Sequence, residues 1–445
     1  MKKVLILGAG LVVRPMAKYL LENGYSVTIA SRTKEKADAI LENHPNSQSI
    51  AWTVDKEDEL EKMIQDHDLV VSLLPYRYHV MVAKLAIKFK KNMVTTSYVK
   101  PEMKALDQQA KDAGIIILNE VGLDPGIDHM SAKKIIDSVH EKGGEVEEFY
   151  SITGALPAME VATLNPFKYK FSWSPIGVLL AGNNDGRFLL KGKELYVPTE
   201  HLFRMKFYAN FPKVGILEIY PNRDSVPYAD LYGIPEAKTV FRGTFRYPGW
   251  SEIIDSMKQL GLFKEDEIDA TNMTYRQFMA SRIGVQADEN LEDNIAKFLG
   301  QPAQSLAIRA MTWLGLFDDE LIGRKDQIIN ITGKLMIDKM MLEGDERDMV
   351  VMMHLFKVKY PDGKRETIRS SMLDFGTPNT DTSVARTVSL PAAAAVVMIL
   401  EGQIKLTGVH IPVVPELYNP ILEQLEKMNI KMFEEYGLPE TLDLH

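Results

Sequence analysis

The sequence contains no cysteine among its 445 residues. This absence excludes disulfides, thiolate nucleophiles, zinc-thiolate sites and iron-sulfur clusters. Histidine is also scarce. The nine residues are scattered along the chain and form no HxxxH or HExxH pairing. The sequence therefore gives no support for a metal site.

Long hydrophobic runs are missing as well. The longest, from Leu390 to Leu400, is shorter than the roughly 20 residues of a membrane-spanning helix. The chain starts with two lysines and an apolar stretch, but Arg14 and Pro15 end that stretch and no small-residue cleavage site follows. We therefore expect a cytoplasmic protein that does not bind membranes.

The charge excludes a further class of partner. The formal net charge is −9, which disfavours binding to nucleic acid. With 45% hydrophobic residues the chain can bury a large core, and its length predicts two or three domains.

The first 30 residues have the pattern of a dinucleotide-binding unit. An apolar strand over 3–7 leads into Gly8-Ala9-Gly10, and apolar residues then recur at helical spacing. Gly8 permits a tight turn, and Gly10 lets the backbone approach a pyrophosphate at the start of the helix. Val13 stands at the third glycine of GxGxxG, which weakens the motif.

The end of the second predicted strand, over 26–30, indicates which dinucleotide is bound. An NAD enzyme places Asp or Glu here to bind the ribose hydroxyls. This chain has Ser31-Arg32-Thr33 instead, and a cation with two hydroxyls suits the 2′-phosphate of NADP(H). The alternative is that Arg32 is an ordinary exposed arginine opening the next helix.

Strands and helices then alternate up to residue 118. Strands are predicted over 49–54, 69–73, 92–95 and 114–118, and helices over 34–41, 58–65, 80–89 and 103–113. This alternation predicts a Rossmann-type doubly wound parallel α/β sheet, which binds ligands at the carboxyl ends of its strands. The polar and loop residues expected along that edge are Asp55, Leu74, Pro75, Thr96, Ser97, Tyr98, Leu123, Asp124 and Pro125. Tyr98 could equally pack in the core, but its place at a strand end favours a function.

The stretch NEVGLDPGIDH, residues 119–129, joins this half to the rest of the chain. Gly122, Asp124, Pro125 and Gly126 fix a sharp turn with a carboxylate beside it. Asp128 is predicted to cap the following helix. Since Asp, Pro and Gly are the usual turn residues, a plain turn is the alternative.

Beyond Gly144 the pattern changes to strands with longer connections. Strands are predicted over 146–154, 165–173 and 217–221, which indicates an inserted α+β substrate domain. From Ser251 to about Leu342 the pattern is mostly helical, so a small helical subdomain is expected. A hairpin over 349–360 and 365–375 is predicted to rejoin the sheet of the second domain.

The end of the chain is expected to return to the first domain. An apolar helix over 387–400 is followed by an amphipathic helix from Pro420. The predicted domains are an NADP-binding Rossmann domain over residues 1–125 and 385–445, an α+β substrate domain over 126–250 and 346–384, and a helical insertion over 251–345.

Two arginines of the second domain are candidate anchors for an anionic substrate. Arg223 stands in PNRDS and Arg246 in RGTFRY. Arginine forms planar, bidentate bonds to carboxylates. Taken singly, either arginine could equally lie on the surface.

Several stretches together resemble the saccharopine dehydrogenase family of the NADP-dependent, glutamate-forming type. They read GAGLVVRP, ASRT, DLVVSLLPY, VTTSYV, NEVGLDPGIDHM, NPFKYKFSWSPIGVLL, YPNRDS and FRGTFRYPGW, and the tail around GVHIPVVPELYNP also fits. NEVGLDPGIDHM and KYKFSWSP together are highly specific. Because the chain begins at the nucleotide domain, it resembles the stand-alone enzyme rather than the fused form with a lysine-ketoglutarate reductase half.

The resemblance implies an oxidoreductase of lysine metabolism. It would interconvert L-saccharopine, NADP and water with L-glutamate, 2-aminoadipate 6-semialdehyde and NADPH, in a physiological direction that the sequence does not specify. The family's substrate contacts match Ser97, Tyr98, Asp124, Arg223, Thr244, Phe245 and Arg246, among which Asp124 and Tyr98 are the catalytic candidates. Its cofactor contacts match Gly10, Leu11, Val12, Ser31, Arg32, Thr33, Leu74, Leu123 and Pro125, to which the turn residue Gly8 is added.

One stretch departs from the family. Where relatives carry YCGGLPAPE, this chain reads SITGALPAME, with Thr153 at the position of the cysteine. A hydroxyl forms hydrogen bonds but does not titrate near neutral pH, so a thiol contribution to acid-base chemistry is excluded.

Two other functions stay open. One is a related NADPH-dependent reductase that joins another amine and aldehyde, although a polyamine would call for acidic residues in place of Arg223 and Arg246. The other is a catalytically silent nucleotide-binding protein, which would not need the substrate residues. The sequence does not specify the oligomeric state, and a homodimer is one expectation.

Overall fold

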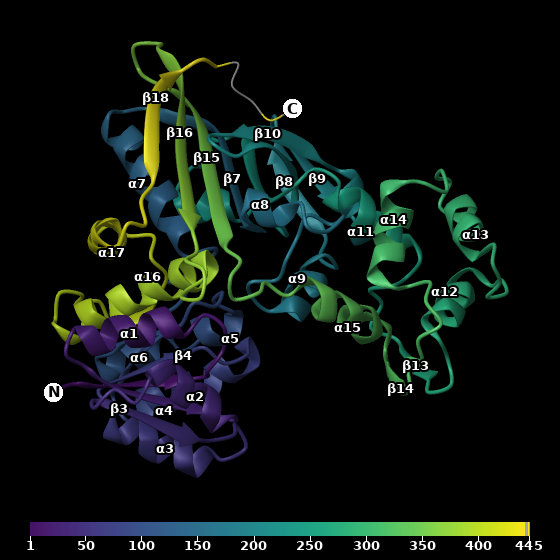
Figure 1. Ribbon diagram of the computed structural model, residues 1–445. Helices are drawn as coiled ribbons and strands as arrows, with labels where there is room; N and C mark the ends of the chain where they lie inside the picture. Colours follow the sequence, from purple (N-terminus) through teal and green to yellow (C-terminus); the bar gives the residue numbers. More distant parts are fainter. Residues whose placement is uncertain (441–443, 445) are drawn as a thin grey trace. The chain divides into compact units, whose positions relative to one another are not determined.

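The computed structural model describes residues 1–440 and 444 (Figure 1). Its internal contacts divide the chain into two units. Unit 1 comprises Met1–Gly144 and Ser370–Glu434, and unit 2 comprises Glu145–Arg369 and the chain from Glu435 onward. Unit 1 thus includes the helix that follows Gly126, which the sequence analysis assigned to the substrate domain.

Unit 1 is built on a seven-stranded parallel sheet with the order β17-β6-β5-β4-β1-β2-β3. Its strands are β1 Lys3–Leu7, β2 Ser26–Ser31, β3 Ser47–Ala51, β4 Leu69–Ser72, β5 Asn92–Val94, β6 Ile116–Leu118 and β17 Gly408–His410. The central strands are buried apolar runs, as expected for a parallel sheet covered on both faces. The predicted Rossmann-type doubly wound sheet is confirmed.

Helices cover both faces of this sheet, with α1 and α16 on one side and α3 and α4 on the other (Figure 1). The helices are α1 Arg14–Glu22, α2 Lys34–Leu41, α3 Glu57–Asp66, α4 His79–Lys88, α5 Pro101–Lys104, α6 Asp107–Ala113, α7 Ile127–Glu141, α16 Ser383–Leu400 and α17 Pro415–Lys427, with a 3-10 turn η1 Tyr76–Tyr78. The helix predicted over 103–113 is therefore two helices. Leu60, Val82, Ala86 and Met103 form part of the core beneath α3 to α6.

The C-terminal segments of unit 1 complete its core. By length and composition α16 could cross a membrane, but 83% of its 18 residues are buried inside the protein, so it is a core helix. It packs against α1 and α17, and β17 extends the sheet beside β6. These segments of the tail therefore lie in the same unit as the nucleotide-binding half.

The start of α7 differs from the expectation. The N-cap position is Gly126, which has no side chain to accept a capping hydrogen bond, and its carbonyl accepts the Met130 N–H at 3.0 Å. Asp128 lies inside the first turn, where its Oδ1 accepts a hydrogen bond of 2.6 Å from the Gly126 N–H. The carboxylate therefore stabilises the helix start from N2, because the negative charge lies at the positive end of the helix dipole.

A second sheet is mixed, has nine strands and is built mostly from unit 2. Its main path is β10-β11-β12-β7-β15-β16-β18, and β8 pairs with β12 and β9. The strands are β7 Glu145–Pro157, β8 Gly186–Leu190, β9 Lys193–Val197, β10 Phe207–Phe211, β11 Gly215–Pro221, β12 Thr239–Arg246, β15 Asp348–Lys359, β16 Arg365–Phe375 and β18 Phe433–Leu438. The predicted hairpin is β15 and β16, and its return to this sheet is confirmed because β15 pairs with β7.

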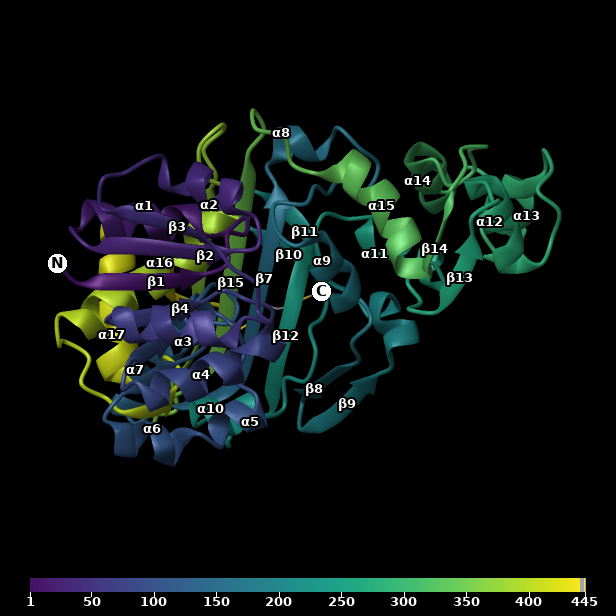
Figure 2. The same ribbon diagram turned by 90° about the horizontal axis from the view of Figure 1, so that it is seen from below.

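Most of the longer helices of unit 2 come between β12 and β15 in the sequence, namely α11 Trp250–Gln259, α12 Tyr275–Ile283, α13 Leu291–Phe298, α14 Leu306–Leu314 and α15 Ile328–Met340. The others are α8 Met159–Ala162, α9 Pro175–Ala181, η2 Thr199–Arg204 and α10 Tyr228–Tyr232. A two-stranded sheet, β13 Glu267–Ala270 and β14 Arg324–Gln327, interrupts the predicted helical region. Figure 2 shows α12, α13 and α14 gathered beside these two strands.

The strand predicted over 165–173 is wrong. This segment is irregular, with the Asn165 side chain donating to Tyr169 O at 2.9 Å and a single bridge between Phe171 and Met341. Tyr169 and Phe171 are fully buried. Their alternation therefore reflects burial of aromatic side chains and not a strand ladder.

Candidate functional site

The loop between β1 and α1 leaves room for a pyrophosphate. Gly8 has φ +113°, and a Cβ there would lie 3.1 Å from Leu73 O, so only glycine fits. Around Gly10 nothing lies within 4 Å of a Cβ position. Among the described residues, none accepts a hydrogen bond from the N–H of Leu11 or Val12. Open space and unsatisfied N–H groups at a helix start fit a dinucleotide phosphate.

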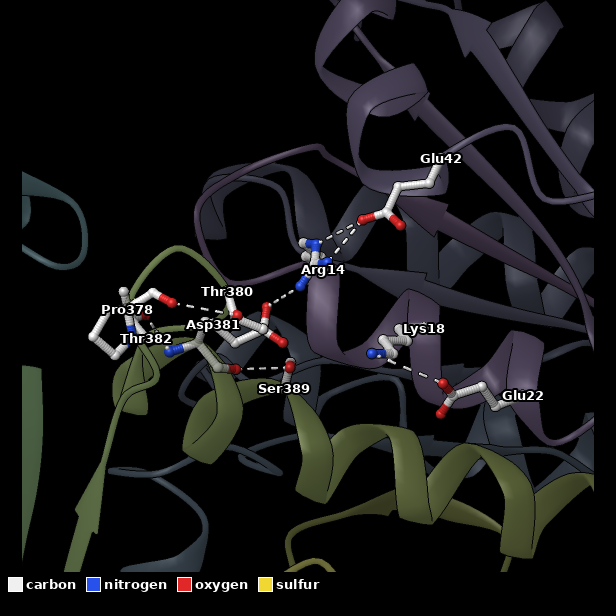
Figure 3. Close-up of polar contacts among 10 residues, drawn as sticks. Arg14, Lys18, Glu22, Glu42, Pro378, Thr380, Asp381, Thr382 and Ser389 are labelled. Carbon is white, nitrogen blue, oxygen red and sulfur yellow. Dashed lines mark hydrogen bonds and ion pairs between the residues drawn. The ribbon is translucent and has the colours of Figure 1, made fainter. Parts of the chain in front are cut away.

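Arg14, the first residue of α1, is engaged by carboxylates (Figure 3). Its Nη2 lies 2.7 Å from Glu42 Oε1, and its Nη1 lies 2.9 Å from Asp381 Oδ1. The bond to Glu42, followed by that to Asp381, raises the pKa of Arg14. Arg14 therefore joins α1 to the end of α2 and to the segment before α16, and the phosphate would be held by the backbone instead.

The residues predicted to select NADP lie at the carboxyl end of β2. Arg32 is exposed and, within residues 1–440 and 444, takes part in no ion pair. The Thr33 N–H donates to Ser31 Oγ at 3.4 Å, and α2 begins one residue later. An unpaired arginine that stands between two hydroxyl residues in the sequence fits a 2′-phosphate.

The turn in NEVGLDPGIDH is closed by backbone contacts. The Asp124–Pro125 peptide bond is cis, and the Gly122 N–H donates to Pro125 O at 2.9 Å. A Cβ on Gly126 would lie 2.0 Å from Gly122 O, so the close approach of the two backbone segments requires glycine at position 126. Leu123 is buried and Asp124 is half-buried. The turn fixes the place of the Asp124 carboxylate.

Asp124 and Tyr98 meet at the carboxyl edge of the sheet. The Tyr98 hydroxyl donates to Asp124 Oδ1 at 2.9 Å, although 26 residues separate the two. Because the hydroxyl proton is directed to the carboxylate, the phenol oxygen can accept a hydrogen bond from a substrate amine. Both side chains are half-buried. The pair therefore offers acceptors suited to an ammonium group.

Ser97 is held by a buried histidine. His79 Nε2 lies 2.8 Å from Ser97 Oγ, and His79 Nδ1 lies 2.8 Å from Ser72 Oγ. Burial lowers the pKa of His79 to about 4, so the imidazole is neutral at pH 7. The two hydroxyls fix the ring, and the ring fixes the Ser97 hydroxyl at the edge of the sheet.

In unit 2, Arg246 lies in an aromatic box. Its guanidinium carbon is 5.0 Å from the ring centre of Tyr169, 5.4 Å from that of Trp250 and 5.8 Å from that of Tyr220. Arg246 is 5% exposed, and Nη1 donates to Phe245 O at 2.8 Å. Among the described residues no carboxylate pairs with it, and its Nε has no hydrogen-bond partner. A buried cation without a counter-ion is prepared for an anionic ligand.

The other predicted substrate contacts of unit 2 differ in exposure. Arg223 is exposed, has φ 57° and follows β11, the neighbour of β12. Thr244 lies on β12 between Tyr220 and Thr153 of the neighbouring strands. The Phe245 side chain is fully buried against Phe211, so only its main chain can reach a ligand.

Thr153, which replaces the family's cysteine, lies on β7 opposite Thr244. It is 8% exposed, and its Oγ1 has no hydrogen-bond partner among the described residues. The hydroxyl is therefore available to a ligand but adds no titrating group.

The predicted residues thus form two groups. In unit 1 the predicted residues lie at or just after the carboxyl ends of adjacent strands. They are the glycine loop, Ser31 to Thr33, Leu74, Ser97, Tyr98, Leu123, Asp124 and Pro125. In unit 2 Arg223 and Thr244 to Arg246 lie on or after adjacent strands. Sequence reasoning missed His79, Tyr169 and Trp250. Tyr169 stood in the specific run KYKFSWSP, but nothing in the spacing placed it on Arg246.

Family models match almost the whole chain. A model described as the saccharopine dehydrogenase NADP binding domain matches residues 4–118, and one described as the saccharopine dehydrogenase C-terminal domain matches residues 122–430.

Similar proteins carry related names. The chain is 38% identical to saccharopine dehydrogenase [NADP(+), L-glutamate-forming] of Schizosaccharomyces pombe, over 98% of this chain and 99% of that protein. It is 37% identical to the mitochondrial alpha-aminoadipic semialdehyde synthase of Mus musculus, over 96% of this chain and 47% of that protein. The structure of apo saccharopine dehydrogenase (L-Glu forming) from Saccharomyces cerevisiae matches with a TM-score of 0.90 and 35% identity, over 98% of this chain and 100% of that one.

Proposed function

The chain belongs to the saccharopine dehydrogenase family, and we propose that it catalyses the NADP-dependent, glutamate-forming reaction of that family. L-Saccharopine, NADP and water are converted to L-glutamate, 2-aminoadipate 6-semialdehyde and NADPH, or the reverse. The protein is an oxidoreductase that acts on a small-molecule substrate, and the resemblance seen in the sequence is confirmed.

The single observation that carries this proposal is the buried guanidinium of Arg246 without a carboxylate partner among the described residues. Saccharopine has three carboxylates and two amines. An unpaired buried cation destabilises the folded state, so a guanidinium in this position indicates that an anion binds there. A silent nucleotide-binding protein has no need for it, and a polyamine would be repelled by it.

The residues divide into anchors and proton-handling groups. We assign Arg223 and Arg246 to substrate carboxylates, because guanidinium groups form bidentate bonds with them. Asp124 and the Tyr98 oxygen, 2.9 Å apart, accept hydrogen bonds from the substrate's secondary ammonium. Ser97, held by His79, donates or accepts at the same edge of the sheet.

The residues predicted to contact the cofactor fit NADP. The backbone of Gly8 to Val12 would hold the pyrophosphate, and Ser31, Arg32 and Thr33 would hold the 2′-phosphate. Held there, the nicotinamide cofactor would supply the hydride acceptor for the substrate carbon beside the secondary amine.

The later steps need proton transfers, which the Tyr98–Asp124 pair can supply. Loss of the hydride leaves a carbon-nitrogen double bond in the substrate, water adds to it, and the product amine departs. An ionised Asp124 favours the cationic nitrogen before these steps and can take the proton that the nitrogen or the water releases. Tyr98 relays that proton through its hydrogen bond to Asp124 Oδ1.

We also propose that the protein works in the cytoplasm, binds neither nucleic acid nor membranes, and forms a homodimer. The net charge of −9 supports the first exclusion, and burial of α16 supports the second. Light scattering after size exclusion would test the dimer.

The decisive experiment measures the initial rate of NADPH formation, followed as the increase in absorbance of the nicotinamide band, with saccharopine and either NADP or NAD. We expect a clear rate with NADP and a much lower rate with NAD. If the folded protein binds NADPH but shows no rate with either cofactor, the proposal fails, and other amine and aldehyde pairs should then be screened in the reductive direction.

A further inference from the structure

Glu120 lies between the two segments that carry Tyr98 and Asp124. It follows β6 by two residues and is 4% exposed. Its φ is +59°, in the left-handed region that residues with long side chains seldom adopt. Unlike the exposed residues Glu42 and Lys90, which also have positive φ, Glu120 is buried, so its side chain must find its partners inside the protein.

The contacts of Glu120 enclose Tyr98. Its N–H donates to Ser97 O at 3.2 Å, and its Oε1 accepts the Val99 N–H at 2.8 Å. One residue therefore fixes the backbone on both sides of Tyr98.

The second carboxylate oxygen joins this segment to α7. Glu120 Oε2 lies 2.7 Å from His129 Nε2, and the His129 side chain is fully buried in the first turn of that helix. Asp124 stands in the turn that leads into the same helix. The buried carboxylate thus links the segment of Tyr98 to the helix that follows Asp124.

We propose that Glu120 and His129 are positioning residues that hold the Tyr98 hydroxyl against Asp124 during the reaction. This inference rests on the function proposed above, in which Tyr98 and Asp124 handle the substrate proton. Neither Glu120 nor His129 needs to touch the substrate. Since a shift of about 1 Å in reacting groups can lower a rate on the order of 10²-fold, loss of this link should appear mainly in kcat.

Three substitutions of Glu120 separate the link from the backbone strain. Glu120→Gln keeps the length and the acceptor for the Val99 N–H. Glu120→Asn and Glu120→Gly suit the left-handed backbone but cannot reach Val99. We expect kcat to fall less than about tenfold in the Gln variant and on the order of 10²-fold in the other two, with the KM for NADP unchanged.

A merely structural role predicts the opposite order, because Gly and Asn relieve the strained backbone. Activity in the order Gly or Asn above Gln would therefore overturn the proposal, as would a kcat within threefold of wild type in all three. Lys90→Gly is the matched control, since Lys90 has φ 54°, is exposed and follows the C-terminal end of α4, the end opposite His79. It should leave kcat unchanged.

A second pair of variants covers the case in which Asn and Gly at position 120 do not fold. His129→Gln keeps a donor for Glu120 Oε2 and should retain kcat within about tenfold, whereas His129→Leu should lose on the order of 10²-fold. Equal activities in the two would overturn the proposal. Wild type is assayed in parallel: no rate with saccharopine and NADP counts against the proposed function, while a normal wild-type rate with unaffected variants counts against the link alone.

Discussion

At the level of single residues, burial distinguishes the two arginines proposed to bind substrate carboxylates. Arg223 is exposed, whereas Arg246 is buried among three aromatic rings without a described carboxylate partner. We expect Arg246→Gln to lower kcat/KM for saccharopine by about 10- to 100-fold, because a hydrogen bond to a charged group contributes about 1.5–3 kcal/mol. Steady-state kinetics with each substrate varied in turn should show an unchanged KM for NADP.

The control for this prediction is Arg282→Gln. The Arg282 Nε is also buried without a partner among the described residues, and its guanidinium lies 5.7 Å from the Phe278 ring centre on α12. This substitution should change the free energy of unfolding and leave the KM for saccharopine as it is. Similar kinetic losses in both variants would mean that Arg246 acts through folding and not through the substrate.

His79 predicts a pH dependence of stability. Burial lowers its pKa from 6.5 to about 4, so the unfolded chain binds a proton that the folded chain does not. The free energy of unfolding should therefore fall by about 2 kcal/mol between pH 7 and pH 5 through this group. Urea unfolding at the two pH values measures this loss, which His79→Gln should remove.

His67 provides the comparison for this experiment, because burial lowers its pKa in the same direction. The wild-type protein thus contains both effects, and only the difference between wild type and His79→Gln reports on His79. If that difference is the same at pH 7 and pH 5, the imidazole of His79 titrates normally in the folded protein.

Residue contacts were predictable only where the strand order dictates them. Tyr98 and Asp124 were expected at one edge because parallel strands end together, and the structure brings them within 2.9 Å. Their catalytic roles stay a prediction. The contact between His79 and Ser97 follows from rotamers and from the start of α4, which no spacing in the sequence encodes.

At the scale of the element, the turn between β6 and α7 is the most constrained. We expect Gly126→Ala to destabilise the protein by more than about 3 kcal/mol, because its Cβ would lie 2.0 Å from Gly122 O. Thermal or urea unfolding measures this loss.

Gly10→Ala is the matched variant in the other loop. Nothing lies within 4 Å of its Cβ position, so the free energy of unfolding should stay within about 0.5 kcal/mol of wild type. The same methyl group would occupy the approach to the pyrophosphate, so the KM for NADP should rise. A stable Gly10→Ala protein with an unchanged KM for NADP would place the pyrophosphate elsewhere.

Elements with a clear period were predicted well and irregular ones were not. The strand over 3–7 and the helix over 34–41 agree with β1 and α2 residue for residue. The strand over 165–173 failed because buried aromatic side chains at alternate positions imitate the strand period without any ladder partner. In most strands the residues that bury alternate side chains also form ladder hydrogen bonds, whereas the segment over 165–173 buries its side chains and forms only one isolated bridge within the described part of the chain.

At the scale of the whole molecule, the order of elements sets the fold, and only part of it can be seen in the sequence. The alternation over residues 1–118 predicts a parallel sheet. The strand β17 joins this sheet beside β6, although the segment Glu145–Arg369 of unit 2 separates the two strands in the sequence. The tail then continues into β18, which joins the sheet of unit 2. Short edge strands such as β17 and β18 have too few residues for their apolar pattern to indicate which strand they pair with.

Ligand binding should stabilise the folded chain in a way that separates an enzyme from a silent nucleotide-binding protein. A ligand at about 100 times its Kd adds about 2.7 kcal/mol to the free energy of unfolding. We expect NADPH and saccharopine each to raise the Tm of wild type, by roughly 2–4 °C per kcal/mol for large domains. Differential scanning fluorimetry with each ligand alone and with both measures these shifts.

The same measurement on Arg246→Gln shows where saccharopine binds. This variant should keep the shift with NADPH, since Gly8 to Val12 and Arg32 belong to unit 1, and lose most of the shift with saccharopine. A nucleotide-binding protein without a substrate would respond to NADPH alone in wild type as well. If the response to saccharopine survives in Arg246→Gln, the substrate carboxylate is bound by another cation, and Arg223 is the first to test.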